Sequence, residues 1–155
     1  MPVGISGSGK STYLRSNFDP DVIVEPDAIR KEITGSTSDQ SRDREVWEEV
    51  LKRVLITLDT KNICILDATN TKSSLRTQFL KQLPAGTHKV ALVFEPKGTD
   101  EKVVDELHGR IQKDLDAGKD RAVVPKEVIA RQLRQFKNGL QNIETQFDEV
   151  QVINT

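Results

Sequence analysis

Cysteine is almost absent from the 155-residue chain, which contains only Cys64. A single cysteine allows no disulfide within the chain, so we expect a reducing, cytoplasmic compartment. Long apolar runs are also lacking, because no stretch approaches the roughly 20 residues that a membrane-spanning helix needs. A glycine-rich loop begins at residue 4, where a signal peptide would stand. We therefore expect neither a membrane partner nor a secretory leader.

An excess of charge of either sign is lacking as well, since the net charge is −1. A near-neutral chain excludes a bulk electrostatic grip on a long duplex, which needs a strongly basic surface. The charges are nevertheless segregated: residues 19–49 hold ten acids and four bases, residues 72–97 five bases and one acid, and residues 108–137 eight bases and four acids. The basic stretches are either solvated helix faces or parts of one anion-binding site.

The chain does have a regular alternation of short apolar runs with amphipathic segments, which is typical of a parallel α/β sheet. The apolar runs predict strands at 3–6, 22–25, 62–67, 88–94 and 150–153. The amphipathic segments predict helices at about 10–17, 27–34, 44–59, 73–83, 100–117 and 125–137. We expect one three-layer domain over residues 1–155, with a central parallel sheet of four to five strands and helices on both faces.

Residues 4–11, GISGSGKS, fill every fixed position of the phosphate-loop pattern G-x-x-x-x-G-K-[ST] between an apolar strand and a helix. The glycines let successive backbone N–H groups converge on phosphate oxygens, and the helix N-terminus adds partial positive charge. Lys10 is expected to reach the β- and γ-phosphates, and Ser11 to offer its hydroxyl to Mg²⁺. The residues predicted to bind ATP in this loop are Gly7, Ser8, Gly9, Lys10, Ser11 and Thr12.

Two aspartates follow predicted strands, at the edge where a parallel sheet gathers its ligands. Asp27 stands three residues before Arg30 on one helix face, so it could accept a proton from a hydroxyl while Arg30 holds a phosphate of the same substrate. The alternative for this pair is a helix cap with a surface ion pair. Asp67 ends the third strand and could hold Mg²⁺ with Ser11, the alternative being a turn at the end of the strand.

A basic segment with a central glycine separates the two last predicted helices. Arg110, Lys113, Lys119 and Arg121 lie around the polar residues 116–120. Basic residues on a mobile segment can close over phosphates and neutralise the charge that spreads in the transition state. We therefore predict a lid at about residues 110–124, the alternative being a solvated connection between helices.

Taken together, these motifs resemble the phosphate-loop kinases of the bacteriophage 5′-polynucleotide kinase type over nearly the whole chain. The resemblance rests on EPDAIR at 25–30, Val46-Trp47, LDATN at 66–70 with Arg76 after it, Arg110, and DRAVVP at 120–125. It implies that Asp27 is the general base for a 5′-hydroxyl, that Arg30 binds a phosphate on the 3′ side of the acceptor, and that Arg121 contacts the ATP phosphates. Asp67 and Arg76 are assigned with Arg30 to the substrate side.

The sequence thus predicts an ATP- and Mg²⁺-dependent kinase in which Lys10, Asp27 and Arg121 are catalytic. The preferred acceptor is the 5′-hydroxyl of a DNA or RNA end. A kinase of a small metabolite or nucleotide, and an ATP-binding regulatory module that acts through a partner, remain the alternatives. Two features depart from the family pattern: three residues precede Gly4 where a longer strand is usual, and no phosphatase signature follows the kinase core.

Overall fold

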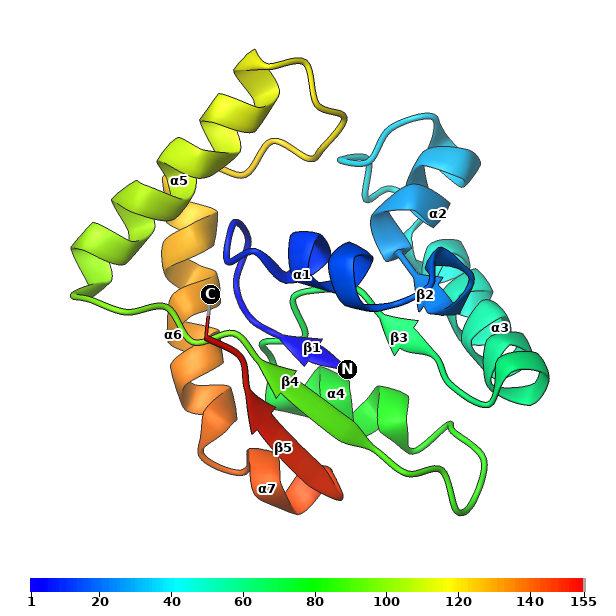
Figure 1. Ribbon diagram of the computed structural model, residues 1–155. Helices are drawn as coiled ribbons and strands as arrows, with labels where there is room; N and C mark the ends of the chain where they lie inside the picture. Colours follow the sequence, from blue (N-terminus) through cyan, green and yellow to red (C-terminus); the bar gives the residue numbers. More distant parts are fainter. Residues whose placement is uncertain (155) are drawn as a thin grey trace.

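The computed structural model describes residues 1–154 and shows five short parallel strands surrounded by helices (Figure 1). The strands are β1 (Pro2–Val3), β2 (Ile23–Val24), β3 (Ile65–Leu66), β4 (Val90–Val93) and β5 (Glu149–Val152). They form a three-stranded sheet in the order β1-β4-β5 and a separate β2-β3 pair. The register aligns Val3 with Val93 and Val24 with Leu66. The predicted parallel α/β architecture is therefore confirmed.

The sheet differs from the prediction in its division and in the length of its strands. Hydrogen bonds still join the two groups, because Gly4 N–H donates to the Thr69 carbonyl over 3.0 Å and the Asn70 amide donates to the Pro2 carbonyl over 2.8 Å. No continuous ladder forms there, since β1 gives way to the phosphate loop at Gly4 after two residues. All five predicted strands are present, but the main sheet holds three of them where the prediction has four to five in one sheet.

Helices cover both faces of the sheet. On one face α1 (Lys10–Asn17) packs Leu14 against Leu92 of β4. On the other face Ala91 and Val93 contact a core built from α4 (Ser73–Leu80), α5 (Asp100–Asp116) and α6 (Lys126–Leu140). The alternation along β4 follows the two-residue period of a strand. None of the helices within residues 1–154 combines the length and the apolarity that a membrane span requires.

A second core supports the β2-β3 pair. A short 3₁₀ turn (Pro20–Val22) leads into β2, and α2 (Pro26–Thr34) and α3 (Asp43–Lys61) follow it. The two helices bury Ile29 and Val50 against Val24 and Leu66. Pro26 opens α2 at the position that tolerates proline, and Gly35 ends the helix with a left-handed φ of 85°. The first turn of α2 is thereby fixed directly beyond the end of β2.

The segments that directly follow β1, β2 and β3 meet at the carboxyl edge of the strands. The loop after β1, the first turn of α2 and the turn after β3 all lie there. Figure 1 shows α5 and the 117–125 loop on one side of this edge and α2 on the other. A one-turn helix that the sequence did not predict, α7 (Ile143–Gln146), connects α6 to β5. The fold thus leaves the carboxyl edge of β1, β2 and β3 open to a ligand.

Candidate functional site

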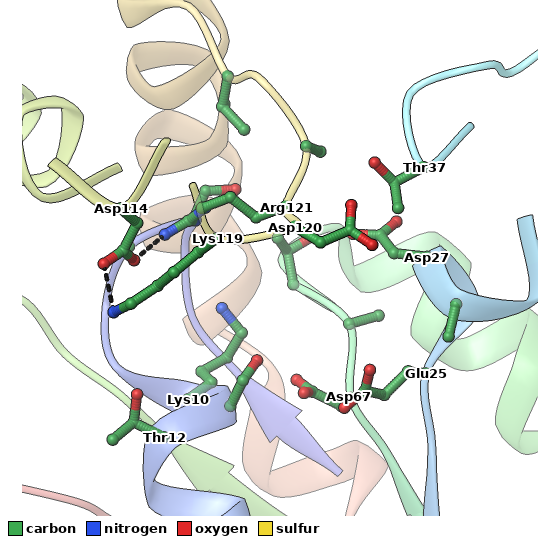
Figure 2. Close-up of a pocket in the computed structure, with 18 of the residues that line it drawn as sticks. Lys10, Thr12, Glu25, Asp27, Thr37, Asp67, Asp114, Lys119, Asp120 and Arg121 are labelled. Atoms are coloured by element: carbon green, nitrogen blue, oxygen red, sulfur yellow. Dashed lines mark hydrogen bonds and ion pairs between the residues drawn. The ribbon is translucent and has the colours of Figure 1, made fainter. Parts of the chain in front are cut away.

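One large cavity, of about 1130 Å³, lies at the carboxyl ends of β1, β2 and β3. The phosphate loop forms its floor, α2 forms one wall, and residues 110–124 form the opposite wall (Figure 2). The predicted site residues that line it are Gly7, Gly9, Lys10, Ser11, Thr12, Asp27, Asp67 and Arg121. Residues that are far apart in the sequence therefore converge here, as the topology of a parallel sheet predicts.

The phosphate loop is held in its folded shape by two later helices. Gly7 adopts a left-handed φ of 80°, and a Cβ atom at this position would stand 3.0 Å from the Leu107 carbonyl of α5. Gln132 of α6 accepts the Ser6 N–H over 2.9 Å through its side-chain oxygen. Sequence reasoning missed Gln132, because its partner lies 126 positions away and no local pattern marks it. The loop is therefore preformed before any phosphate binds.

Lys10 is a buried cation with one protein partner. The residue is 7% exposed, and its Nζ donates to the Ile5 carbonyl over 2.9 Å. Burial lowers the pKa of Lys10 to about 8, although the negative charge of the nearby Asp67 opposes the shift. A desolvated ammonium of this kind is stabilised by an anion brought next to it. Lys10 is therefore placed to receive a phosphate.

Two further cations stand above Lys10 on the opposite wall. Arg121 donates through Nη1 to Asp114 Oδ2 over 2.8 Å, and Lys119 donates through Nζ to Asp114 Oδ1 over 2.7 Å (Figure 2). These partners hold the pKa of the Asp114 carboxyl below its usual value. The Arg121 Nε is buried and has no hydrogen-bond partner within residues 1–154. The space between the loop and this wall therefore suits an anionic ligand.

Ser11 and Asp67 offer oxygen atoms at the base of the cavity. Burial raises the pKa of Asp67, while a hydrogen bond with Ser11 and the charge of Lys10 oppose the shift. No cluster of three or more His, Cys, Asp and Glu residues suited to a metal occurs within the described range 1–154. A hydroxyl and a carboxylate match the hard oxygen donors that Mg²⁺ takes, the other positions being left to water and phosphate. The two residues fit the predicted cation.

The α2 wall of the cavity contains Asp27 at the start of the helix. Its side chain is 63% exposed, whereas the Arg30 side chain is only 8% exposed. Arg30 donates through Nη1 to Asp27 Oδ1 over 2.5 Å and through Nε to Asp43 Oδ1 over 3.0 Å. Sequence reasoning missed Asp43, which lies on α3 and has no spacing that would connect it with Arg30. The predicted face shared by Asp27 and Arg30 is present, but Arg30 lies behind it.

One ion pair connects the two walls of the cavity. Asp120, in the loop between α5 and α6, forms an ion pair with Lys31 of α2. Among the two basic stretches of the sequence, only 108–137 contributes to the cavity, through Arg110, Lys113, Lys119 and Arg121. Residues 72–97 do not line this cavity, although Lys97 borders the smaller cavity beside Arg110, so their meeting at one ligand stays a prediction.

Two predicted substrate residues, Arg30 and Arg76, are buried and do not line the cavity, and Arg76 is the one that points away to other segments. It is 2% exposed and does not line the cavity. Its guanidinium donates to the carbonyls of Asn70 and Thr71 over 2.8 and 3.1 Å, to the Gly139 carbonyl over 2.5 Å, and to Gln146 Oε1 over 3.0 Å. All its nitrogens are used to tie the turn after β3 to α6 and α7, so no donor is left for a substrate. The predicted role is wrong.

Ser8 also lies apart from the main cavity. Its side chain borders a smaller cavity of about 190 Å³ together with Phe94 and Arg110. The hydroxyl is buried and accepts or donates no hydrogen bond within residues 1–154. The turn of the loop directs this side chain to the side of Gly4, where a Cβ atom would be 3.0 Å from the hydroxyl. The predicted ATP contact of Ser8 therefore does not involve its side chain in this geometry.

The fold and the preformed loop define a kinase-like P-loop protein that binds nucleotides. Residues 1–138 match the family described as the AAA domain, and the chain belongs to this family. No curated protein matches the chain. Among solved structures, a chain in the Pnkp1/Rnl/Hen1 RNA repair complex is similar, with 24% identity and a TM-score of 0.76 over 92% of this chain. The match covers 44% of that chain, so the present chain spans less than half of its length.

Proposed function

We propose that the protein transfers the γ-phosphate of ATP to the 5′-hydroxyl of a DNA or RNA end. The observation that carries the proposal is that one cavity has cations on one side and an exposed carboxylate on the other. Lys10 and Arg121 face the place of an anionic donor, and Asp27 faces the place of a neutral acceptor. A site that only bound nucleotide would have no use for the second wall. In-line transfer between two substrates requires both.

On the donor side, the loop N–H groups and Lys10 hold the phosphates, while Arg121 neutralises charge from above. Mg²⁺, when bound at Ser11 and Asp67, would offset the charge of the triphosphate. Burial raises the pKa of Asp67, and a cation beside it would favour the ionised carboxylate.

On the acceptor side, Asp27 accepts the proton of the attacking hydroxyl. Its Oδ1 is bound to Arg30 Nη1, which orients the carboxylate and leaves Oδ2 for the acceptor. Arg30 has Nε and Nη1 occupied, and Nη2 is the nitrogen left for a phosphate on the 3′ side of the acceptor. One such contact selects a nucleotide end over a bare nucleoside.

The choice of a nucleic-acid acceptor is supported by the residues EPDAIR and DRAVVP, which resemble the polynucleotide kinase pattern, and by the fold shared with a chain of an RNA repair complex. A small phosphorylated metabolite is the second candidate. It is favoured by the pairing of Arg30 with Asp27 and Asp43 and of Lys31 with Asp120. These pairs leave few free cations on the acceptor wall, so an acceptor with one phosphate suffices.

Incubation with γ-labelled ATP and a panel of acceptors tests the proposal. The panel holds a 5′-hydroxyl oligonucleotide of DNA and of RNA, a nucleoside 3′-monophosphate, a nucleoside 5′-monophosphate and simple sugars. We expect label on the 5′-hydroxyl oligonucleotides and none on oligonucleotides that already carry a 5′-phosphate. Transfer to the sugars or the 5′-monophosphate alone would support the metabolite kinase. Slow hydrolysis without transfer would support a regulatory module, and undiminished transfer in excess EDTA would contradict the magnesium site.

A further inference from the structure

The Arg121 guanidinium is held at one nitrogen and free along one edge. Nη1 donates to Asp114, whereas Nε is buried without a partner and Nη2 donates to no acceptor within residues 1–154. In a planar guanidinium, Nε–H and Nη2–H point in parallel from the same edge. This edge is the one that forms two parallel hydrogen bonds to one phosphate or carboxylate. No protein acceptor within residues 1–154 occupies this edge, but its Nε is covered by neighbouring atoms, so Nη2 is the nitrogen left for a phosphate.

Asp114 is the fixed point to which the loop after α5 is attached. It lies in the last turn of α5, and its carboxylate gives one oxygen to Lys119 and the other to Arg121. The backbone carbonyl of Asp114 also accepts the Lys119 N–H over 3.0 Å. Both cations lie beyond Gly118, which has a left-handed φ of 74° and where a Cβ atom would meet no other atom within 4 Å. Asp114 therefore fixes Lys119 and Arg121 relative to the end of α5.

We propose that Asp114 is a positioning residue for the donor site: by holding Arg121 Nη1, it presents Nη2 to the phosphate chain of the nucleotide. A carboxylate that competed with the phosphate would occupy the two-donor edge, because that pairing is the stronger one. The observed bond uses the opposite nitrogen. The second oxygen is neutralised by Lys119, so Asp114 adds little net repulsion toward an anion. The inference rests on the proposed function only in taking a nucleoside triphosphate as ligand.

The test is the affinity of a non-hydrolysable ATP analogue with Mg²⁺ for the full chain and five variants. Asp114→Asn removes the carboxylate, Arg121→Gln removes the guanidinium, and a third variant combines both. Asp116→Asn is the matched control, since Asp116 ends the same helix, pairs with Gln112 over 2.9 Å and does not line the cavity. It loses the same charge without touching Arg121. Its affinity therefore reports the through-space effect of one lost carboxylate.

We expect Asp114→Asn to bind the analogue about tenfold more weakly than Asp116→Asn, as the loss of a charge-assisted contact predicts. Arg121→Gln should lose at least as much, and the double variant should be no weaker than Arg121→Gln alone. Asp114→Glu, which keeps the charge and both acceptor oxygens, should recover most of the affinity. It also serves as a further variant if Asp114→Asn melts early.

Three results would overturn the inference. Binding by Asp114→Asn equal to that of the control would deny Asp114 any positioning role. Tighter binding than the control would make Asp114 a competitor of the phosphate. Additive losses in the double variant would show that it acts independently of Arg121. The readout is binding, so this test does not depend on phosphate transfer. A wild type that phosphorylates no acceptor would overturn the proposed function, and the affinities of the variants would still test the role of Asp114. A wild type that fails to bind the analogue would overturn both.

Discussion

The two sides of the cavity both contain buried cations, but these cations differ in how many carboxylates they are bonded to. On the donor side, Lys10 is buried with one carbonyl partner, and Arg121 has a buried nitrogen without a partner among residues 1–154. On the acceptor side, Arg30 is equally buried but donates to the carboxylates of both Asp27 and Asp43. Lys10 is bonded to no carboxylate and Arg121 to one, whereas Arg30 is bonded to two, so the buried charge is less compensated on the donor side. Only the donor side therefore gains stability when an anion arrives.

This difference assigns the two walls different tasks. The donor side converts its unfavourable burial into affinity for phosphate, since the ligand supplies the missing counter-charge. The acceptor side has its charges already compensated, so it contributes orientation and selectivity more than affinity. Substitutions on the two sides should consequently change different quantities, which the following experiments separate.

The largest effect is expected from Asp27→Asn on the acceptor side. Asparagine keeps the shape and caps a helix as well as aspartate, but it cannot take the proton of the acceptor. The single-turnover rate should fall by about 10²–10⁴-fold, the contribution of a positioned general base. ATP affinity and melting temperature should hardly change, since the donor side is untouched. A normal rate in this variant would reduce Asp27 to a helix cap.

The second effect is that of Lys10→Met on the donor side. The methionine keeps the length of the side chain but removes the charge over the phosphates, so turnover should fall by about 10²–10³-fold. The empty protein should become more stable, by about 1–2 kcal/mol in the free energy of unfolding, because an uncompensated buried charge is gone. Denaturant titration of both proteins without nucleotide measures this change. A loss of stability would contradict the contrast between the two walls.

The same exchange at Arg30 should act in the opposite direction on stability. Arg30→Met leaves Asp27 and Asp43 without their donor, so the free energy of unfolding should fall by about 1–3 kcal/mol. The wild type should use a nucleoside 3′-monophosphate better than the bare nucleoside, and the variant should lose this preference through a higher KM for the phosphorylated acceptor. Steady-state kinetics with both acceptors decide the point. Equal use of both by the wild type would favour a metabolite kinase without this contact.

The smallest effect concerns the proton of Lys10. Its pKa of about 8 in the empty protein lies below the ordinary 10.5, so between these values the unfolded chain binds more protons and the empty protein gains stability as the pH rises. A phosphate favours the ammonium form, so nucleotide binding at pH of about 9 should take up close to one proton. Calorimetry in two buffers of different ionisation heat measures this uptake. Lys10→Arg, which stays protonated, should abolish it.

Most of the fold could be predicted from the sequence, because the spacing of apolar residues and the residues that begin or end an element are local signals. The alternation of apolar runs located all five strands, and the helical periods located six helices to within a few residues at their ends. The division of the sheet was not accessible, since it depends on how β1 and β3 meet around Gly4 and Asn70. The one-turn helix α7 was missed because four residues give no measurable period.

The candidate site could be predicted from the sequence where the order of the strands alone places its residues. Lys10, Asp27 and Asp67 each follow a strand of a parallel sheet, so their meeting in one cavity could be expected, while their chemical roles stay predictions. Asp43 and Asp114 could not be found, because their roles depend on arginines brought close by tertiary contacts. Arg76 was misassigned for a related reason: position after a strand does not reveal whether a guanidinium faces a ligand or carbonyl groups.

The burial of Arg76 has a consequence for how the sequence can drift among relatives. Gly139 has no room for a side chain, because a Cβ atom would lie 2.3 Å from the Thr71 carbonyl and 3.1 Å from Arg76 Nη1. Lysine would carry the same charge at position 76, but its single nitrogen cannot reach acceptors on three separate segments. The Thr71 carbonyl alone excludes a side chain at position 139, whatever residue stands at position 76. Relatives that lose the arginine should therefore still carry glycine at position 139.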